Sequence, residues 1–409
     1  MKTIEKNIPE LRFPEFDGKW QENRLGEIAR FSKGKGISKD NISEDGKNVC
    51  IRYGELYTHY NEIIGEIISR TNVNKRDLVM SEKNDVIIPA SGESSIDIAK
   101  ASCVLRDGVA LGGDLNIIKT NLNGVFLAYC LNHKKKKDIA RLSQGISVVH
   151  LYHSQLKLLK IKYPKSEEQD KITDFILAID DKIQQLNKKK TLLEQYKKGV
   201  MQKIFSQQIQ FKDDNGKNYP DWEEKKLGAI AEKVNEKNAT NMVRFVLTNS
   251  ASQGIVSQQD YFDKDIANQE NLGGYYIVKK DDFVYNPRIS NFAPVGPIKR
   301  NKLKRGIMSP LYMIFRFTVS DVGYFEYYFE TSLWHKYMKR VANYGARHDR
   351  MNIVNDDFLK MPIFVPRENE EIAKIVNMLN CIQAKIEQVS MQLNDVRTFK
   401  KGLLQQMFV

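Results

Sequence analysis

The most regular pattern along the chain is a narrow stripe of apolar residues in two long segments that are otherwise polar. In the first segment, from about 165 to 205, these residues recur at alternating steps of four and three. This spacing is a heptad seam, which places all of them on one side of an α-helix. It predicts a helix of about 40 residues, or roughly 60 Å. The seam comprises Ile172, Ile176, Ile179, Ile183, Leu186, Leu193, Val200 and Ile204.

The second segment, from about 367 to 408, repeats this seam 203 residues later. A helix with one narrow apolar stripe must bury that stripe. The economical partner is the other copy, so we expect the two helices to pair as an antiparallel coiled coil with a pseudo-twofold axis. Each helix could instead pack on its own globular region or on an outside partner. The second seam comprises Ile375, Leu379, Ile382, Ile386, Val389, Leu393, Val396, Leu403 and Met407.

Lysines interrupt both seams, at Lys190, Lys197 and Lys400. We expect them either to cap the buried part of the seam or to mark where it opens toward another subunit. The residues expected to hold the coiled coil and the subunit interface are apolar seam residues from both segments. They are Ile172, Ile179, Ile183, Leu186, Ile375, Ile382, Ile386 and Val389.

A region of about 140 residues precedes each long segment and contains short apolar runs separated by Gly, Pro, Asn and Asp. Asp85–Ile88 and its counterpart Asp282–Tyr285 are typical of buried strands, so both regions are predicted to be β-rich. Each region is also expected to contain one helix, near 125–142 in the first and near 324–344 in the second.

The chain contains this arrangement, a mixed region followed by a long helical segment, twice. Trp20 recurs as Trp222, and the sequence Leu-Gly-x-Ile-Ala that follows each tryptophan also recurs, in both cases 202 residues later. A repeat of this length is large enough for a domain with its own core. The predicted fold class is therefore α+β, with two tandem β-rich domains that are each followed by a long helix. The predicted boundaries are 1–164 and 222–366 for the domains, 165–206 and 367–409 for the helical spacers, and 207–221 for a linker.

Composition narrows the class of partner. The formal net charge of +13 favours a polyanion, most simply nucleic acid. The four cysteines show no metal-ligand spacing, so they indicate reduced thiols in a cytoplasmic protein and no metal site. The first ten residues lack the apolar stretch of a signal peptide, and no stretch approaches a membrane helix. We therefore expect no membrane association.

Candidate catalytic motifs are incomplete. Asn286-Pro287-Arg288 follows an apolar strand, as in adenine methyltransferases, but lacks the second proline and the aromatic residue of their motif. Lys33-Gly34-Lys35-Gly36 does not fit the phosphate-binding loop pattern. The chain is thus predicted to be a recognition protein and not an enzyme. Two alternatives are a non-catalytic coiled-coil scaffold with two protein-binding domains, and a self-sufficient nuclease or methyltransferase.

Several short motifs together resemble one family. The segment Pro9–Phe16 precedes Trp20, and Tyr219-Pro220-Asp221 precedes Trp222 as a shorter echo. Pro164 and Pro366 each lead into a long helix whose first turn is acidic. With the Leu-Gly-x-Ile-Ala repeats and the paired seams, this arrangement resembles the specificity subunit of type I restriction–modification enzymes over essentially the whole chain.

The resemblance implies a division of labour. Each β-rich domain would be a target-recognition domain that reads one half of a split site on double-stranded DNA. The helices would set the spacer and dock two methyltransferase subunits, and two restriction/translocase subunits would complete the complex. No cofactor is then expected on this chain, because S-adenosylmethionine, ATP and Mg²⁺ would lie on the partner subunits. The two domains differ markedly in sequence, which predicts an asymmetric bipartite site.

Base reading needs polar side chains that reach base edges from loops. In the first domain such residues lie in a polar and aromatic stretch, in the loop after a buried strand, and before the final strand. The second domain offers them in the loops equivalent to the last two. The basic run Lys134–Lys137 is expected either to track phosphates or to be a solvated helix end. The predicted DNA-binding residues are Arg52, Tyr53, Ser91, Gln144, Ser147, Arg288, Asn291, Arg347, His348 and Arg350.

Overall fold

The computed structural model describes residues 7–145, 147–261, 272–343 and 349–409. The chain forms two compact units: unit 1 contains residues 1–188 and 389–409, and unit 2 contains residues 189–388. Two long helices, α7 (Ser166–Phe205) and α13 (Asn369–Gln406), contribute a segment to each unit. The predicted α+β class with two long helices is confirmed. Each unit contains parts of both helices, so the two units do not test the predicted domain boundaries, which remain a prediction.

Unit 1 contains a mixed region, here called mixed region 1 (residues 20–163), built on two sheets. The larger sheet has the order β2-β11-β7-β9-β4, and only the β4–β9 pair is parallel. Its strands are β2 (Ala29–Lys33), β4 (Ile63–Ile64), β7 (Val86–Pro89), β9 (Ser102–Val104) and β11 (Leu115–Thr120). The smaller sheet contains β3 (Asn48–Ile51), β5 (Ser69–Thr71), β6 (Val79–Met80) and β10 (Ala110–Leu111).

Two short strand pairs and a set of helices complete mixed region 1. The pairs are β1 (Gln21–Arg24) with β13 (Lys160–Tyr163), and β8 (Ser91–Gly92) with β12 (Val149–His150). The α-helices are α1 (Leu25–Ile28), α2 (Tyr53–Thr58), α3 (Ser95–Ile98), α4 (Gly124–His133), α5 (Lys136–Leu142) and α6 (His153–Leu156). The 3-10 helices are η1 (Lys39–Asn41) and η2 (Lys75–Asp77).

Unit 2 repeats this plan in mixed region 2 (residues 222–365). Its four-stranded sheet has the order β15-β22-β19-β20, formed by β15 (Ala231–Lys233), β19 (Phe283–Tyr285), β20 (Ile298–Arg300) and β22 (Met313–Phe317). The strand pairs are β14 (Glu223–Lys226) with β23 (Pro362–Val365), β16 (Leu247–Ser250) with β17 (Gly254–Ser257), and β18 (Tyr276–Val278) with β21 (Gly306–Met308). The helices are α8 (Leu227–Ile230), α9 (Gln258–Tyr261), α10 (Val322–Glu330), α11 (His335–Val341) and α12 (Asn355–Leu359).

The single helix expected in each mixed region is in fact two helices, so that prediction was wrong. In unit 2 the break falls at Thr331, whose hydroxyl donates to the carbonyl of Tyr328 at 2.7 Å and accepts from the backbone N–H of Leu333 at 3.3 Å. A threonine side chain that bonds to nearby backbone in this way competes with the helical hydrogen bonds. In unit 1 the break falls within the lysine run, between α4 and α5.

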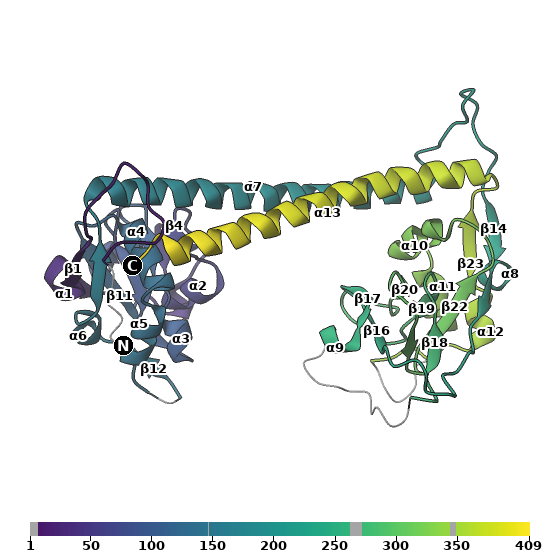
Figure 1. Ribbon diagram of the computed structural model, residues 1–409, viewed down its shortest axis with the longest axis horizontal. Coiled ribbons are helices and arrows are strands. Elements are labelled where there is room, and N and C mark those ends of the chain that lie inside the picture. The colour runs from purple at the N-terminus through teal and green to yellow at the C-terminus, as the bar shows by residue number, and fades with distance from the viewer. Residues whose placement is uncertain (1–6, 146, 262–271, 344–348) are drawn as a thin grey trace. The chain divides into compact units, whose positions relative to one another are not determined.

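In each unit the two helix segments run along one side of the mixed region (Figure 1). In unit 1, Arg397 donates to Asn187 and Lys400 pairs with Asp180, so the residue numbers of α7 fall as those of α13 rise. The segments are therefore antiparallel, as predicted.

The seams lie in the cores of the units. In unit 1, Ile172, Ile176 and Ile179 share a buried cluster with Leu403 and Met407. That cluster also contains residues of α4, and Phe126 packs against Phe408 with ring centroids 5.2 Å apart. Each seam thus packs both on the other helix and on the mixed region of its own unit. Of the eight predicted seam residues, seven are buried and Ile183 is partly buried.

Candidate nucleic-acid interface

Two of the predicted DNA-binding residues of unit 2, Arg288 and Arg350, line a pocket of about 260 Å³. Arg288 and Arg350 form an antiparallel bridge, which places the two side chains on the same face of the backbone. Arg288 lies 3.7 Å from the carboxylate of Asp349, but its side chain is 69% exposed. An exposed pair of this kind contributes about 0–1 kcal/mol. Both arginines line the pocket, and the exposed Arg288 side chain can contact a ligand.

Asparagine side chains shape the wall of this pocket. Asn286 accepts from the backbone N–H of Arg288 at 3.0 Å and donates to the carbonyl of Asn249 at 3.0 Å. The first of these bonds forms a local turn that positions Arg288. The motif that looked like an incomplete methyltransferase signature thus has a structural role here. Among the lining residues that the structure describes, none is acidic, so the pocket is cationic and rich in hydrogen-bonding groups.

The remaining candidates of unit 2 are less well placed. Asn291 lies exposed in the turn after this pocket, beside Phe292, whose side chain is 86% exposed. Sequence reasoning missed Phe292 because a lone phenylalanine in a polar stretch gives no sign of its exposure. Arg347 and His348 lie outside the described residues.

The candidates near the start of mixed region 1 are largely engaged within the fold. Arg52 precedes α2 and pairs with Glu55 at 3.2 Å, and the same carboxylate accepts from Ser69 at 2.6 Å. Tyr53 is 38% exposed. Ser91 lies in β8 and not in the predicted loop. Its carbonyl accepts from the hydroxyl of Tyr57 at 2.8 Å, and the residue is 9% exposed.

The loop before the final strand of mixed region 1 is the more accessible candidate surface. Gln144 forms a bridge with His150, and Ser147 is exposed. His150 stacks on Tyr152 with ring centroids 6.1 Å apart, and the ammonium of Lys33 lies 6.0 Å from the Tyr152 ring. Sequence reasoning missed the grouping of these last three residues. The run from Val149 to Tyr152, in which aliphatic residues alternate with His150 and Tyr152, was the signal that could have found part of it.

The basic run of mixed region 1 borders a different surface. Lys134 and Lys135 line a groove of about 1030 Å³ together with Lys160. Lys160 pairs there with Glu22 at 3.2 Å, so the groove is of mixed charge.

Within the described ranges, no group of three or more His, Cys, Asp or Glu residues is arranged to hold a metal ion. None of the helices in the same ranges has the length and apolar character needed to cross a membrane.

Comparison with known proteins places the fold in one class. The solved S subunit of a type I restriction–modification system from M. genitalium matches with a TM-score of 0.59 and 14% identity, covering 98% of this chain and 99% of that one. A chain from a structure describing assembly and conformational transition of the type I system matches with a TM-score of 0.54 and 15% identity, covering 95% and 97%. These likenesses show the fold: two mixed regions and two long helices.

Sequence matches cover parts of the chain. Residues 17–195 match the type I restriction modification DNA specificity domain. The MjaX specificity subunit of Methanocaldococcus jannaschii is 32% identical over 127 residues, 29% of this chain and 30% of that protein. The MjaVIII specificity subunit of the same organism is 25% identical over 236 residues, 56% of this chain and 52% of that protein. The matches thus span about a third and about half of these relatives. These matches confirm the resemblance to type I specificity subunits.

Proposed function

We propose that this chain is the non-catalytic, sequence-reading subunit of a type I restriction–modification system. Mixed regions 1 and 2 are its target-recognition domains, and each reads one half of an asymmetric bipartite site on double-stranded DNA. The long helices set the spacer and dock two methyltransferase subunits. The observation that carries the proposal is the duplicated plan of the chain, whose first copy matches a DNA specificity domain.

The two mixed regions offer different chemistry to DNA, which supports an asymmetric site. Mixed region 2 presents Arg288 and Arg350 beside asparagine side chains. Arginine recognises guanine and asparagine recognises adenine through paired hydrogen bonds, each worth about 1–3 kcal/mol of discrimination. Mixed region 1 presents Gln144 and Ser147 near a stacked His–Tyr pair. The net charge of +13 adds a sequence-independent attraction to phosphates.

The chemistry of modification and cleavage is assigned to other chains. Two methyltransferase subunits supply S-adenosylmethionine, and two restriction/translocase subunits use ATP and Mg²⁺. The complex is expected to act in the cytoplasm, where its DNA substrate lies. A coiled-coil scaffold with two protein-binding domains is the alternative, and it requires no sequence preference on DNA.

Selection from random DNA tests the proposal. The chain, co-expressed with its methyltransferase partner, is incubated with a random duplex pool at about 150 mM salt, because non-specific phosphate binding weakens with salt. The expected result is one split motif with one spacer. Binding to every sequence with strong salt dependence and no enriched motif would leave only the scaffold.

Substitution in one mixed region sharpens the same experiment. Arg288→Ala and Arg350→Ala are each expected to relax one position in one half of the motif about ten-fold, since a paired contact contributes about 1–3 kcal/mol. The matched control is Arg305→Ala in the same region, where Arg305 contacts Glu236 at 3.3 Å and does not line the pocket. The control should leave both halves of the motif unchanged.

A further inference from the structure

Two of the lysines that interrupt the seams contact specific partners in the fold. In unit 1, Lys400 extends from α13 and forms an ion pair with Asp180 on α7. Its ammonium also donates to the hydroxyl of Tyr129 on α4 at 3.3 Å and lies 4.9 Å from the centre of that ring. The lysine side chain is only 16% exposed. Three elements therefore meet at one ammonium group: both long helices and the mixed region.

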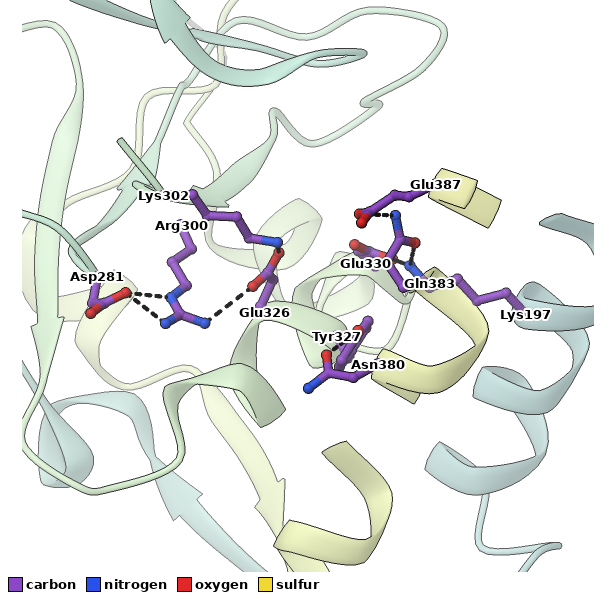
Figure 2. A network of polar contacts seen from close by, with 10 residues as sticks. All are labelled: Lys197, Asp281, Arg300, Lys302, Glu326, Tyr327, Glu330, Asn380, Gln383 and Glu387. Carbon is purple, nitrogen blue, oxygen red and sulfur yellow. Dashed lines mark hydrogen bonds and ion pairs between the residues drawn. The ribbon is translucent and has the colours of Figure 1, made fainter. Parts of the chain in front are cut away.

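Unit 2 repeats this contact with the helices exchanged. Lys197 extends from α7, pairs with Glu330 at 2.8 Å and donates to Gln383 on α13 at 3.1 Å (Figure 2). Its ammonium lies 4.9 Å from the centre of the Tyr327 ring on α10, and its side chain is 12% exposed. Lys197 and Lys400 are equivalent in the repeat, so the same position reaches the same aromatic site in both units.

The polar partners around the two lysines differ. In unit 1 the acidic partner, Asp180, belongs to a long helix and also accepts from the Tyr129 hydroxyl. In unit 2 the acidic partner, Glu330, belongs to mixed region 2, and the Tyr327 hydroxyl donates to Asn380 at 2.7 Å. The ion pair therefore joins helix to helix in unit 1 and helix to mixed region in unit 2.

Mixed region 2 contains a second polar network near this contact (Figure 2). Arg300 pairs with Asp281 at 2.6 Å and with Glu326 on α10 at 3.3 Å. Lys302 pairs with the other oxygen of Glu326 at 2.5 Å. These bonds attach α10 to β20 and to the turn that precedes β19.

The hydrophobic effect is non-directional, so an apolar seam specifies orientation less strictly than a polar contact with one favourable geometry. A buried polar residue in a coiled-coil seam lowers stability but selects one register. An ammonium held by an ion pair, a hydrogen bond and an aromatic face has one favourable position. We propose that Lys197 and Lys400 are positioning residues that fix the orientation of each mixed region on the helices of its own unit.

The consequence for DNA reading rests on the proposed function. Each base pair moves a half-site by roughly 3.4 Å and rotates it by roughly 34° about the duplex axis. A mixed region whose angle on its helices is fixed can therefore reach its half-site at only one spacer length. We infer that the two lysines make the spacer length selective, while the loops select the bases.

The first test measures orientation without DNA. Pairs of spin labels are placed within one unit of the full chain, at exposed positions, in a Cys381→Ser background. Ile68→Cys with Met391→Cys reports on unit 1, and Leu311→Cys with Tyr196→Cys reports on unit 2. The native cysteines other than Cys381 are buried.

Lysine-to-methionine substitutions keep the length of the side chain and remove its charge. Lys400→Met is expected to widen the distance distribution in unit 1 and Lys197→Met that in unit 2. Exposed neighbours supply the controls, Lys401→Met and Lys198→Met, which should change neither distribution. Unchanged widths in the Lys400→Met and Lys197→Met proteins would overturn the proposal.

Gentler variants cover the case in which a methionine variant does not fold. Asp180→Asn removes the charge that pairs with Lys400, and Glu330→Gln removes the charge that pairs with Lys197. Each should widen the distribution of its own unit only. If Lys400→Arg and Lys197→Arg keep the narrow distance distribution that the methionine variants lose, the positive charge is the feature that fixes the orientation.

The second test measures the spacer in cells by mapping methylated sites. The unsubstituted protein should methylate a split motif with one spacer, and Lys400→Met or Lys197→Met should raise sites with a shifted spacer about ten-fold, equivalent to about 1.4 kcal/mol. Lower methylation with an unchanged spacer would contradict a role in spacing. If the unsubstituted protein shows no split motif, the proposed function fails, and the label distributions still decide the role of the lysines.

Discussion

The same tryptophan–glutamate contact joins the start of each mixed region to a long helix, but among the described residues only one of the two carboxylates has a cation. The indole N–H of Trp20 donates to Glu168 at 3.2 Å, and that of Trp222 donates to Glu371 at 3.1 Å. Glu168 lies in the first turn of α7 and Glu371 in the first turn of α13. Their exposures are 2% and 4%, so both carboxylates are buried.

The surroundings of the two carboxylates differ in charge. Arg12 binds both oxygens of Glu168, at 2.8 and 2.6 Å. In unit 2 the segment before Trp222 supplies Asp214 instead, which pairs with Lys374 at 2.8 Å. Glu371 Oε2 has no hydrogen-bond partner among the described residues. The repeat thus preserves the aromatic contact, while the preceding segments, which differ in sequence, decide whether the buried charge is neutralised.

The two tryptophan–glutamate contacts are here called the junctions. The largest expected difference between them comes from removing a charged side chain at each. Arg12→Ala should destabilise unit 1 by about 3 kcal/mol, because it leaves Glu168 buried without its cation. Glu371→Gln should change the stability of unit 2 by about 0–1 kcal/mol in the favourable direction, since it removes a buried charge that has no ionic partner. Hydrogen exchange of the full chain, followed in peptides from β1–β2 and β14–β15 across a urea series, measures both values.

A double variant provides the control for this comparison. Adding Glu168→Gln to Arg12→Ala should recover part of the lost stability, because the buried charge is then removed as well. Equal losses for Arg12→Ala and Glu371→Gln would show that the two junctions do not differ electrostatically.

The next effect tests the indole hydrogen bonds themselves. Trp222→Phe should cost about 2–3 kcal/mol, since the buried carboxylate of Glu371 loses its donor. Trp20→Phe should cost about 1 kcal/mol, because Glu168 keeps both bonds from Arg12. The same exchange peptides report both losses. Trp20 is the more buried of the two side chains, so a larger loss for Trp20→Phe would mean that packing dominates over hydrogen bonding.

Much of the fold could be predicted from periodicity because the relevant interactions are local or repeated. The heptad seams predicted helices at about 165–205 and 367–408, and the structure has them at Ser166–Phe205 and Asn369–Gln406. The buried run at Asp85–Ile88 lies in or next to β7. Periodicity could not show that each unit contains segments of both helices, since that depends on contacts between residues about 200 positions apart.

The candidate sites were harder to predict than the fold. Ser91 was expected in a loop, but its backbone pairs with β12. A strand of two residues is too short to show a periodic pattern in the sequence. Arg288 and Arg350 were both proposed from sequence, yet their bridge joins loops that are far apart in the chain. Arg12 appeared only as part of a motif, because its acidic partner lies 156 residues away.

A smaller difference is expected at the repeated Leu-Gly dipeptide. A Cβ atom on Gly26 would lie 2.9 Å from the Cβ of Lys157, whereas one on Gly228 would lie 3.2 Å from the Cβ of Leu359. Gly26→Ala should therefore destabilise unit 1 by about 1–2 kcal/mol, and Gly228→Ala should destabilise unit 2 by less than about 1 kcal/mol. Urea unfolding monitored by exchange would measure the two values. Gly54→Ala, where nothing lies within 4 Å of the added atom, is the control.

The smallest expected effect is a difference in pH dependence between the units. Burial raises the pKa of Glu371 above its usual 4.5, and the hydrogen bond from Trp222 offsets only part of this rise. The folded state therefore holds the proton more tightly than the unfolded state, so stability from this group increases as the pH falls from 7 toward 4.5. Hydrogen exchange of the β14–β15 peptides, corrected for intrinsic rates, should show rising protection over this range in the unsubstituted protein relative to Glu371→Gln. In unit 1, the bond to Glu168 raises the pKa of Arg12, which stays charged throughout. If Glu371→Gln follows the same pH profile as the unsubstituted protein, the buried carboxylate is not the source of the pH dependence.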